Sequence, residues 1–311
     1  MKTYLGLDVE GATLMMGELD NCGNILRYKK YDAGFFNQQS AFEVIKKSID
    51  DYIQSVGWVG DRPSAMGVGL LGRVDNANGV WLQIDPIRTH PISLAKELSQ
   101  QYGMTCYIDN DVKAATRAER HFGFGQISKN FIYISVGTGI AAGFVVNGRQ
   151  IRGSQFNAGE VGHTQVGVNI GVRCSCGRTD CVEAIASGLG MDQCARLLAP
   201  RYETKLEIPS SVRIQVKDIF YLSQHGDALC QQLVENASQA LANLIMNLVR
   251  VSDPETVVLG GRMVADGYLH TKVLEKLHST TMRFVKNGVV LTKLNPEFIG
   301  LMGAGAVAMD V

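Results

Sequence analysis

The sequence contains no run of eighteen apolar residues, which predicts that no segment spans a membrane. It also lacks an excess of either charge, because 30 basic and 30 acidic residues balance and neither kind forms a block. Nucleic-acid-binding proteins usually carry a basic surplus on one face, so we expect no nucleic-acid partner. The N-terminal stretch MKTYLGLDVEG is too short and too polar for a secretory signal. We therefore expect a cytoplasmic protein.

Seven cysteines, an odd number, argue against a disulfide framework in a chain expected to stay inside the cell. Three of them, Cys174, Cys176 and Cys181, fall within the segment CSCGRTDC. Tetrahedral zinc needs four ligands, and His163 in AGEVGH is the nearest candidate for the fourth. Such a set leaves no open position for substrate water, so we predict a structural zinc ion. The alternative is three buried free cysteines.

Two segments of the sequence follow one plan. Residues 4–32 and residues 131–155 each combine an apolar strand, a turn with glycine, a second strand, a turn with Asn and Gly, and a third strand. Asn-Gly is among the strongest signals for a β-hairpin. Helical periodicity predicts helices at 41–57, 92–103, 111–123, 227–251 and 299–311. Together these patterns predict an α/β protein with two lobes of related topology facing a cleft, unless the repeat is a coincidence.

The segment GHTQVGVNIGVRCSCGRTDCVEAIASG resembles the signature of the ROK family of repressors and sugar kinases. The family pattern is Gly-His, a spacer, Cys-x-Cys-Gly-x-x-Gly-Cys-x-Glu and Ala-Ser-Gly, and only its second-last glycine is changed, to Asp180. Further family motifs follow in order along nearly the whole chain, namely GLDVEGAT, GLLGRVD, DNDVKAA, VGTGIAAG, AGEVGH and VVLGG.

The resemblance implies a two-lobed hexokinase/actin-like fold, which is a duplicated ribonuclease H-like fold with an interlobe cleft and an embedded structural zinc site. It implies ATP, Mg²⁺ and a small-molecule sugar as ligands, zinc at the four residues named above, and a homodimer. We expect residues 1–112 with 299–311 to form a smaller lobe and residues 113–298 to form a larger lobe that carries the zinc. Family repressors add an N-terminal helix-turn-helix domain, and because this sequence opens on the first hairpin we expect no repressor.

By the same resemblance, Asp111 is the base that takes the proton from the sugar hydroxyl. The alternative is that Asn110 or Asp111 only caps the helix that follows. The residues implied to bind the sugar are Gly72, Asn110, Asp111, Glu160, His163 and Glu183. The residues implied to bind ATP and Mg²⁺ are Asp8, Gly11, Thr13, Gly137, Thr138, Gly139, Gly260 and Gly261. The Gly-Thr-Gly turn could bring backbone N–H groups close to phosphate oxygens, or it could simply bend a hairpin.

The first phosphate loop departs from the family pattern, which is usually Asp-x-Gly-Gly-Thr. Aligned without gaps, Glu10 replaces a glycine and Ala12 replaces the threonine, whereas a gapped alignment keeps GAT intact and treats Glu10 as an insertion. Lys113 stands where asparagine or glutamine commonly follows Asp111. We hypothesise that Lys113 pairs with Glu10 across the cleft and compensates for the change.

The sequence as a whole predicts an ATP-dependent hexose kinase that acts on the 6-hydroxyl of a hexose or an N-acylated amino sugar such as N-acetylmannosamine. The segments CVEAIASG and ADGYL resemble bacterial N-acetylmannosamine kinases. Asp85 stands where relatives often have asparagine, and His90 lacks a familiar counterpart, so the substrate is expected to differ from glucose. The alternative is a non-catalytic sugar sensor or pseudokinase, which Glu10 and Ala12 favour because they make the first phosphate loop degenerate.

Overall fold

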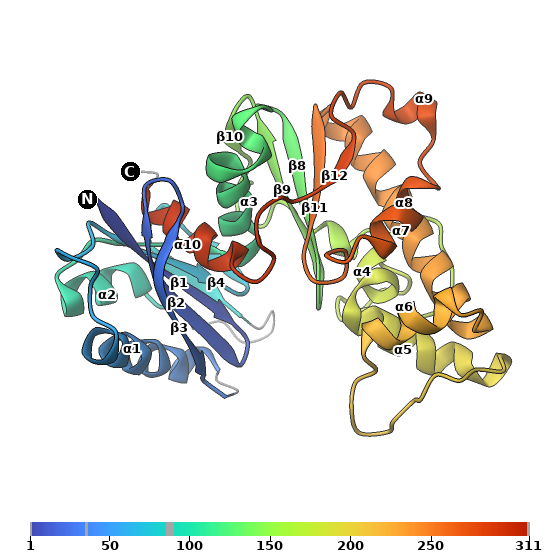
Figure 1. The fold of residues 1–311 in the computed structure, drawn as a ribbon, viewed down its shortest axis with the longest axis horizontal. Coiled ribbons are helices and arrows are strands. Elements are labelled where there is room, and N and C mark those ends of the chain that lie inside the picture. The colour runs from blue at the N-terminus through green and yellow to red at the C-terminus, as the bar shows by residue number, and fades with distance from the viewer. Residues whose placement is uncertain (1, 35–36, 85–89, 310–311) are drawn as a thin grey trace. The chain divides into compact units, whose positions relative to one another are not determined.

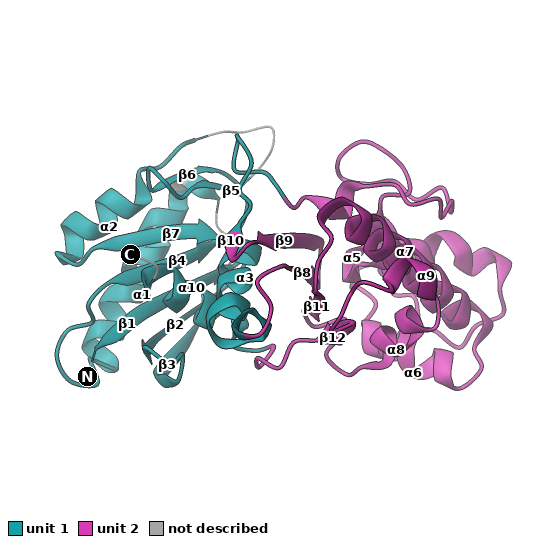
Figure 2. Cartoon of the chain, turned by 90° about the horizontal axis from the view of Figure 1, so that it is seen from above, with its two compact units in different colours: residues 1–126, 150–158, 297–311 teal, residues 127–149, 159–296 magenta. Residues whose placement is uncertain are grey.

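The computed structural model describes residues 2–34, 37–84 and 90–309 (Figure 1). The chain divides into two compact units, shown in different colours in Figure 2. Unit 1 consists of residues 1–126, 150–158 and 297–311, and unit 2 consists of residues 127–149 and 159–296. The boundary predicted after residue 112 differs from this division. It would cut helix α3 (Asp111–Phe122), which belongs entirely to unit 1.

Unit 1 is built on a five-stranded sheet with the order β3-β2-β1-β4-β7. Strands β1, β2 and β3 form an antiparallel meander, and β4 and β7 continue the sheet parallel to β1. The bounds of these strands are β1 (Thr3–Glu10), β2 (Thr13–Asp20), β3 (Ile25–Asp32), β4 (Met66–Leu70) and β7 (Cys106–Asn110). A separate hairpin is made by β5 (Arg73–Asp75) and β6 (Val80–Gln83).

One face of this sheet is buried by apolar side chains. Leu5, Leu7 and Val9 alternate along β1 and share one core with Ile45 and Ile49 of α1. Helix α2 contributes to the same core. The helices here are α1 (Gln38–Ser55) and α2 (Leu94–Tyr102), close to the two predicted from helical periodicity.

Helix α10 (Ile299–Met309) packs on the sheet of unit 1 at β1 and β4, and also on α3 (Figure 1). The backbone of α10 lies directly against the backbones of these two strands. A Cβ atom on Gly67 would lie 1.9 Å from the carbonyl oxygen of Ala304, and one on Gly6 would lie 2.8 Å from that of Leu301. The helix predicted at 299–311 is therefore present, and it packs closely on the sheet.

Unit 2 repeats the plan of unit 1 with the strand order β10-β9-β8-β11-β12. Strands β8, β9 and β10 form the meander, and β11 and β12 run parallel to β8. The strands are β8 (Phe131–Val136), β9 (Ile140–Val146), β10 (Arg149–Gln150), β11 (Thr256–Gly260) and β12 (Val289–Leu291). Both predicted hairpin repeats are therefore present, each at the start of a sheet with the same strand order.

The helices of unit 2 pack around the buried helix α7, which begins after the N-cap Asp227. The helices are α4 (Val182–Ala186), α5 (Gly188–Leu198), α6 (Val216–Gln224), α7 (Ala228–Ser252), α8 (Tyr268–Leu274) and α9 (Ser279–Met282). Short 3₁₀ turns are η2 (Val161–His163) and η3 (Ala199–Arg201) in unit 2, and η1 (Phe124–Gln126) at the end of α3 in unit 1. Among the described residues, no helix combines the length and the apolar character that a membrane span requires.

Candidate functional site

The carboxyl ends of three parallel strands gather the candidate residues of unit 1. In the ladder, Asp8 of β1 pairs with Gly69 of β4, and Leu70 pairs with Asn110 of β7. The chain continues from Leu70 into the turn at Gly72, whose carbonyl oxygen accepts a hydrogen bond from the Asn110 side chain at 3.0 Å. Polar residues predicted from separate motifs thus lie along one edge of one sheet, which is where α/β proteins commonly bind ligands.

Asn110 holds Asp111 in place. Its amide nitrogen Nδ2 donates to Oδ1 of Asp111 at 2.7 Å, and its Oδ1 accepts from the backbone N–H of Lys113 at 3.2 Å. Asn110 is therefore the N-cap of α3, and Asp111 occupies the first turn, where the helix dipole favours a carboxylate. The helix-capping interpretation is confirmed for Asn110. Both Nδ2 hydrogens already have protein acceptors, so this side chain acts on Asp111.

The sequence analysis did not predict a role for the buried carboxylate of Asp109, two residues before Asp111. Asp109 is fully buried, and its oxygens accept from Nε of Arg117 at 3.1 Å and from a terminal nitrogen of Arg152 at 2.6 Å. The backbone N–H of Asn110 donates to the same carboxylate at 2.9 Å. Burying a charge demands partners of this kind, so Asp109 fixes the backbone that carries the candidate base.

Asp8 is also buried, and it lies against the first turn of α10. A Cβ atom on Gly300 would come within 2.0 Å of Oδ2 of Asp8. Only glycine leaves room for this carboxylate at the start of the helix. The role expected for Asp8 at the metal and phosphate end of the site stays a prediction.

The first loop expected to bind phosphate, between β1 and β2, is a tight two-residue turn. Glu10 pairs with Thr13 at the end of a regular ladder, so Gly11 and Ala12 form the turn. The hydroxyl of Thr13 donates to the carbonyl oxygen of Glu10 at 3.2 Å. Glu10 is exposed and Lys113 is buried. Both belong to unit 1, so the expectation that they lie on opposite sides of a cleft is wrong, because α3 stays with the first unit. Of the two positions expected to alter substrate choice, His90 is exposed and Asp85 lies outside the described residues.

Unit 2 presents its own turn at the carboxyl end of β8, formed by Gly137, Thr138 and Gly139. The carbonyl oxygens of Gly137 and Thr138 accept from the backbone N–H groups of Gly188 at 2.8 Å and of Leu189 at 3.3 Å, at the start of α5. The backbone N–H of Gly137 donates within the turn to the carbonyl oxygen of Gly139 at 2.9 Å, so backbone hydrogen bonds hold the turn both internally and against α5.

Glu183 supports the same turn. Its Oε2 accepts from the backbone N–H of Ile140 at 2.8 Å, and a Cβ on Gly139 would lie 2.7 Å from that oxygen. One carboxylate oxygen of a residue expected at the sugar thus already accepts a hydrogen bond next to the turn at Gly137–Gly139. Sequence spacing gave no sign of this link, because the two residues are 43 positions apart.

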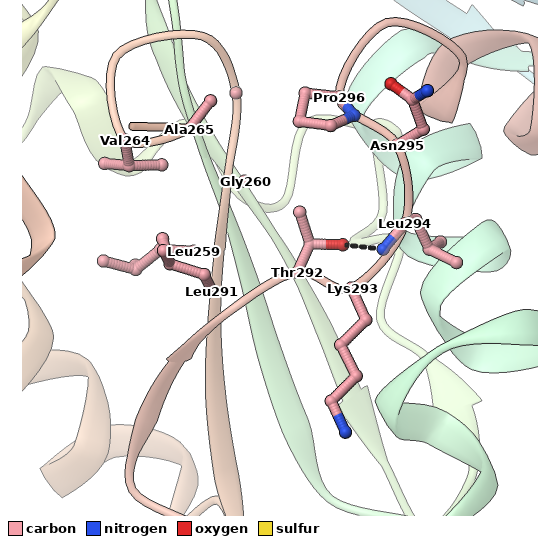
Figure 3. A pocket seen from close by; sticks show the side chains of 11 residues that line it. Leu259, Gly260, Val264, Ala265, Leu291, Thr292, Lys293, Leu294, Asn295 and Pro296 are labelled. Carbon is pink, nitrogen blue, oxygen red and sulfur yellow. Dashed lines mark hydrogen bonds between the residues drawn. The ribbon is translucent and has the colours of Figure 1, made fainter. Parts of the chain in front are cut away.

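Gly260 and Gly261 lie at the same edge of the sheet of unit 2, because Gly260 pairs with Ser135 near the end of β8. They line a cavity of about 220 Å³, seen in Figure 3. The cavity is lined by Leu259, Gly260, Gly261, Val264, Ala265, and residues 291–296. Its wall is mostly apolar, with polar groups at Thr292, Lys293 and Asn295. This mixture of side chains is the one that small-molecule sites use, although the cavity is smaller than most of them.

The four predicted metal ligands converge within unit 2. One ligand atom from each of His163, Cys174, Cys176 and Cys181 lies within 4.8 Å of the others. Sγ of Cys176 is 3.6 Å from Sγ of Cys181, and Sγ of Cys174 is 3.4 Å from Nδ1 of His163. A tetrahedral zinc ion with Zn–S bonds of about 2.3 Å separates its sulfur ligands by about 3.8 Å. The geometry and the donor set therefore fit zinc.

The surroundings of the cluster tune its ligands. Hydrogen bonds from Arg178, first that of its backbone N–H, lower the pKa of Cys176 to about 6. Burial raises the pKa of Cys181 to about 12, a cost that a bound cation would offset. The second ring nitrogen of His163, Nε2, lies 4.0 Å from Oε2 of Glu160, which is half exposed. His163 thus turns one nitrogen to the cysteines and the other to Glu160, a candidate sugar-binding residue.

Comparison with known proteins identifies the lineage of the chain. The model of the ROK family matches residues 4–311. This chain belongs to the ROK family. Among ROK relatives, the glucokinase of Thermotoga maritima is 26% identical over 316 residues, covering 98% of this chain and 97% of the relative. The N-acetylmannosamine kinase of Haemophilus influenzae is 34% identical over 202 residues, covering 65% of this chain and 61% of the relative.

Regulators and solved structures of the ROK family are similar to the chain as well. The N-acetylglucosamine repressor of Escherichia coli O157:H7 is 25% identical over 298 residues, covering 95% of this chain and 72% of the relative. The crystal structure of a ROK hexokinase from Thermus thermophilus aligns with a TM-score of 0.77 at 26% identity, covering 99% of this chain and 98% of that chain. The two-lobed hexokinase-like α/β fold expected from the sequence is thereby confirmed.

Proposed function

We propose that this ROK protein is an ATP-dependent sugar kinase with Asp111 as the catalytic base. The observation that carries the proposal is the fixed Asp111 carboxylate at the carboxyl edge of the sheet of unit 1. A base that is held by Asn110 needs no rearrangement before it meets a sugar hydroxyl. Asp111 accepts the proton of that hydroxyl as its oxygen attacks the terminal phosphoryl group of ATP.

The nucleotide end of the reaction is assigned to unit 2 together with Asp8. We assign the adenosine to the cavity beside Gly260 and Gly261, and the phosphates to the turn at Gly137–Gly139. Asp8 is the carboxylate that would hold Mg²⁺, which neutralises phosphate charge when it is bound. Zinc at the four ligands would be structural, since all its coordination positions are taken by side chains.

Arg73 favours an N-acylated amino sugar over a plain hexose. Its Nε is buried and has no hydrogen-bond acceptor among the described residues. It follows Gly72, whose carbonyl oxygen is already bound to Asn110 beside the candidate base. A buried donor without an acceptor is costly, and the acyl carbonyl of an N-acylated amino sugar would satisfy it once the Arg73 side chain turns toward the bound sugar. We therefore propose the 6-hydroxyl of such a sugar, with N-acetylmannosamine as the first candidate.

The test is ADP release across glucose, mannose, glucosamine and the N-acetylated hexosamines. We expect an N-acetylated sugar to give the highest kcat/KM. Asp111→Asn should lower kcat by roughly 10²–10⁴-fold, because it removes the base and preserves the size of the side chain. Normal turnover by a folded Asp111→Asn protein would refute the assigned role.

Arg73→Met separates the substrate assignment from the catalytic one. We expect kcat/KM for the N-acetylated sugar to fall by roughly tenfold or more, since a charged donor is lost, and kcat/KM for a plain hexose to change little. Equal losses on both sugars would remove the argument for an acyl-binding arginine.

A second candidate function, a sugar sensor without kinase activity, is favoured by one observation. The exposed carboxylate of Glu10 stands beside the two-residue turn at Gly11, where it would repel phosphate oxygens. A sensor would gain thermal stability from a sugar and release no ADP with any sugar. A kinase would show both responses.

A further inference from the structure

Asp180 occupies a backbone conformation that side chains other than glycine rarely adopt. Its φ is +56°, in the left-handed region, and the residue is buried. Aspartate is among the few residues enriched there, but glycine has no steric penalty at all. At this position the ROK pattern has glycine, so this chain has accepted a less favourable residue inside its cysteine segment. A favourable interaction elsewhere must therefore offset the steric penalty of aspartate at this position.

Hydrogen bonds to the Asp180 carboxylate offset this steric penalty. Its Oδ1 accepts three consecutive backbone N–H groups, from Ile170 at 3.1 Å, Gly171 at 2.8 Å and Val172 at 3.0 Å. The backbone N–H of Asp180 donates in turn to the carbonyl oxygen of Val172 at 2.8 Å. Four hydrogen bonds thus tie residue 180 to the segment 170–172. A glycine at position 180 could make only the last of them.

These bonds join the two ends of the loop that carries the cysteines. Val172 lies two residues before Cys174, and Asp180 lies directly before Cys181. Between them the chain forms a narrow hairpin, in which the N–H of Cys174 donates to the carbonyl oxygen of Arg178 at 2.8 Å. The separation of Cys174 and Cys181 is therefore fixed by backbone contacts that do not involve a metal.

We propose that Asp180 is a positioning residue that preorganises the cysteine loop for zinc. The inference rests on the proposed zinc site. With the carboxylate present, the loop is held near its metal-binding geometry before the ion arrives, so less ordering opposes binding. Without it, zinc itself must close the loop. Asp180 then raises zinc affinity although none of its atoms is a ligand.

The test is the zinc affinity of the full chain, measured by competition with a chromophoric chelator. Asp180→Gly restores the family residue and removes backbone strain, yet we expect it to weaken zinc binding by roughly 10–100-fold, as the loss of outer-shell support does elsewhere. Asp180→Asn keeps a carbonyl oxygen for the three N–H groups and should lose less. It also serves as the informative variant if the glycine variant does not fold.

Asp20 provides a matched control in unit 1. Its Oδ1 also accepts two backbone N–H groups of a turn, those of Cys22 and Asn24, both at 2.9 Å. Asp20→Gly should lower the melting temperature and leave zinc affinity unchanged. The rise in melting temperature caused by added zinc should shrink in Asp180→Gly and stay normal in Asp20→Gly, because that rise depends on the zinc dissociation constant.

The outcomes distinguish a failure of the role proposed for Asp180 from a failure of the proposed zinc site. Suppose that wild-type protein binds one zinc ion and that the zinc dissociation constant of folded Asp180→Gly is within twofold of the wild-type value. The role of Asp180 is then overturned and the zinc site stands. If wild-type protein binds no zinc, the zinc site itself is overturned, and the inference with it. Weaker binding in Asp180→Gly than in Asp20→Gly supports both.

Discussion

Asn110 donates a hydrogen bond from its side-chain amide to Oδ1 of Asp111 at 2.7 Å, so the candidate base is held by the residue that precedes it. Asn110→Ala removes this donor and the helix N-cap together. We expect kcat to fall more than KM rises, and stability to drop by about 1 kcal/mol. Steady-state kinetics and urea unfolding measure the two effects. A change confined to KM would mean that Asn110 serves the sugar and not the base.

Asn110→Asp tests the same contact through its charge. The variant keeps an N-cap oxygen but places a second carboxylate beside Asp111, and a like charge raises the pKa of a neighbouring acid. The acid limb of the pH profile of kcat/KM should therefore move to higher pH than in the wild type. An unmoved acid limb in an active variant would contradict Asp111 as the titrating base.

Gly300 is predicted to be irreplaceable because of Asp8. The extra methyl group of Gly300→Ala would fall 2.0 Å from Oδ2 of Asp8, so the carboxylate or the helix must move. We expect a loss of roughly 1–3 kcal/mol of stability and a sharp loss of kinase activity. Gly60→Ala is the control, because a Cβ there meets nothing within 4 Å. Equal behaviour of the two variants would rule out the close contact with Asp8.

The hypothesis that Lys113 compensates for Glu10 remains open to a double-mutant cycle. ATP affinity is measured in Glu10→Gly, Lys113→Asn and the double variant. If the two side chains interact, the double variant should deviate from additivity by about 0.5 kcal/mol or more. Because Lys113 is buried and Glu10 exposed, loss of the lysine should be the more damaging change. Strict additivity would end the hypothesis.

Metal content gives a direct test of the cysteine cluster. Purified wild-type protein should hold one zinc ion per chain by atomic emission, and prolonged chelation should lower its melting temperature, since an ion bound only to the folded state stabilises that state. Cys176→Ser should lose the zinc. Cys22→Ser, which changes an exposed cysteine outside the cluster, should keep it. Zinc in neither the wild type nor the control would disprove the site.

Acid should weaken the contact between Asp192 and Arg196. The hydrogen bond from the Arg196 side chain lowers the pKa of Asp192 below its ordinary value of 3.8. A lowered pKa in the folded state contributes stability above pH 3.8, and this contribution is lost as the pH falls through the folded-state pKa. Asp192→Asn should therefore be less stable than wild type at pH 7, with a difference that shrinks below about pH 3.8. Urea unfolding at several pH values checks this, and a constant difference would contradict it.

Most of the fold could be predicted from local patterns in the sequence. The hairpins were readable because the turns with Asn and Gly interrupt alternating strands, and the zinc ligands because three cysteines and a histidine lie close together in the chain. Asp109 was not readable, since its partner Arg152 is 43 positions away and nothing in the spacing links them. The bond from Ile140 to Glu183 spans the same distance and was missed for the same reason. Such contacts are set by tertiary packing.

The packing of α10 on Gly6 and Gly67 means that unit 1 cannot complete its fold until α10 has been synthesised. Strand β1 leaves the ribosome before any segment of unit 2, whereas the helix that covers it leaves after all of them. Until residues 299–309 emerge, one side of the first sheet stays bare, while every segment of unit 2 is already available. Completion of unit 1 therefore waits until unit 2 has been synthesised, and a chain stalled short of residue 299 would display an unfinished sheet to the cell's quality-control machinery.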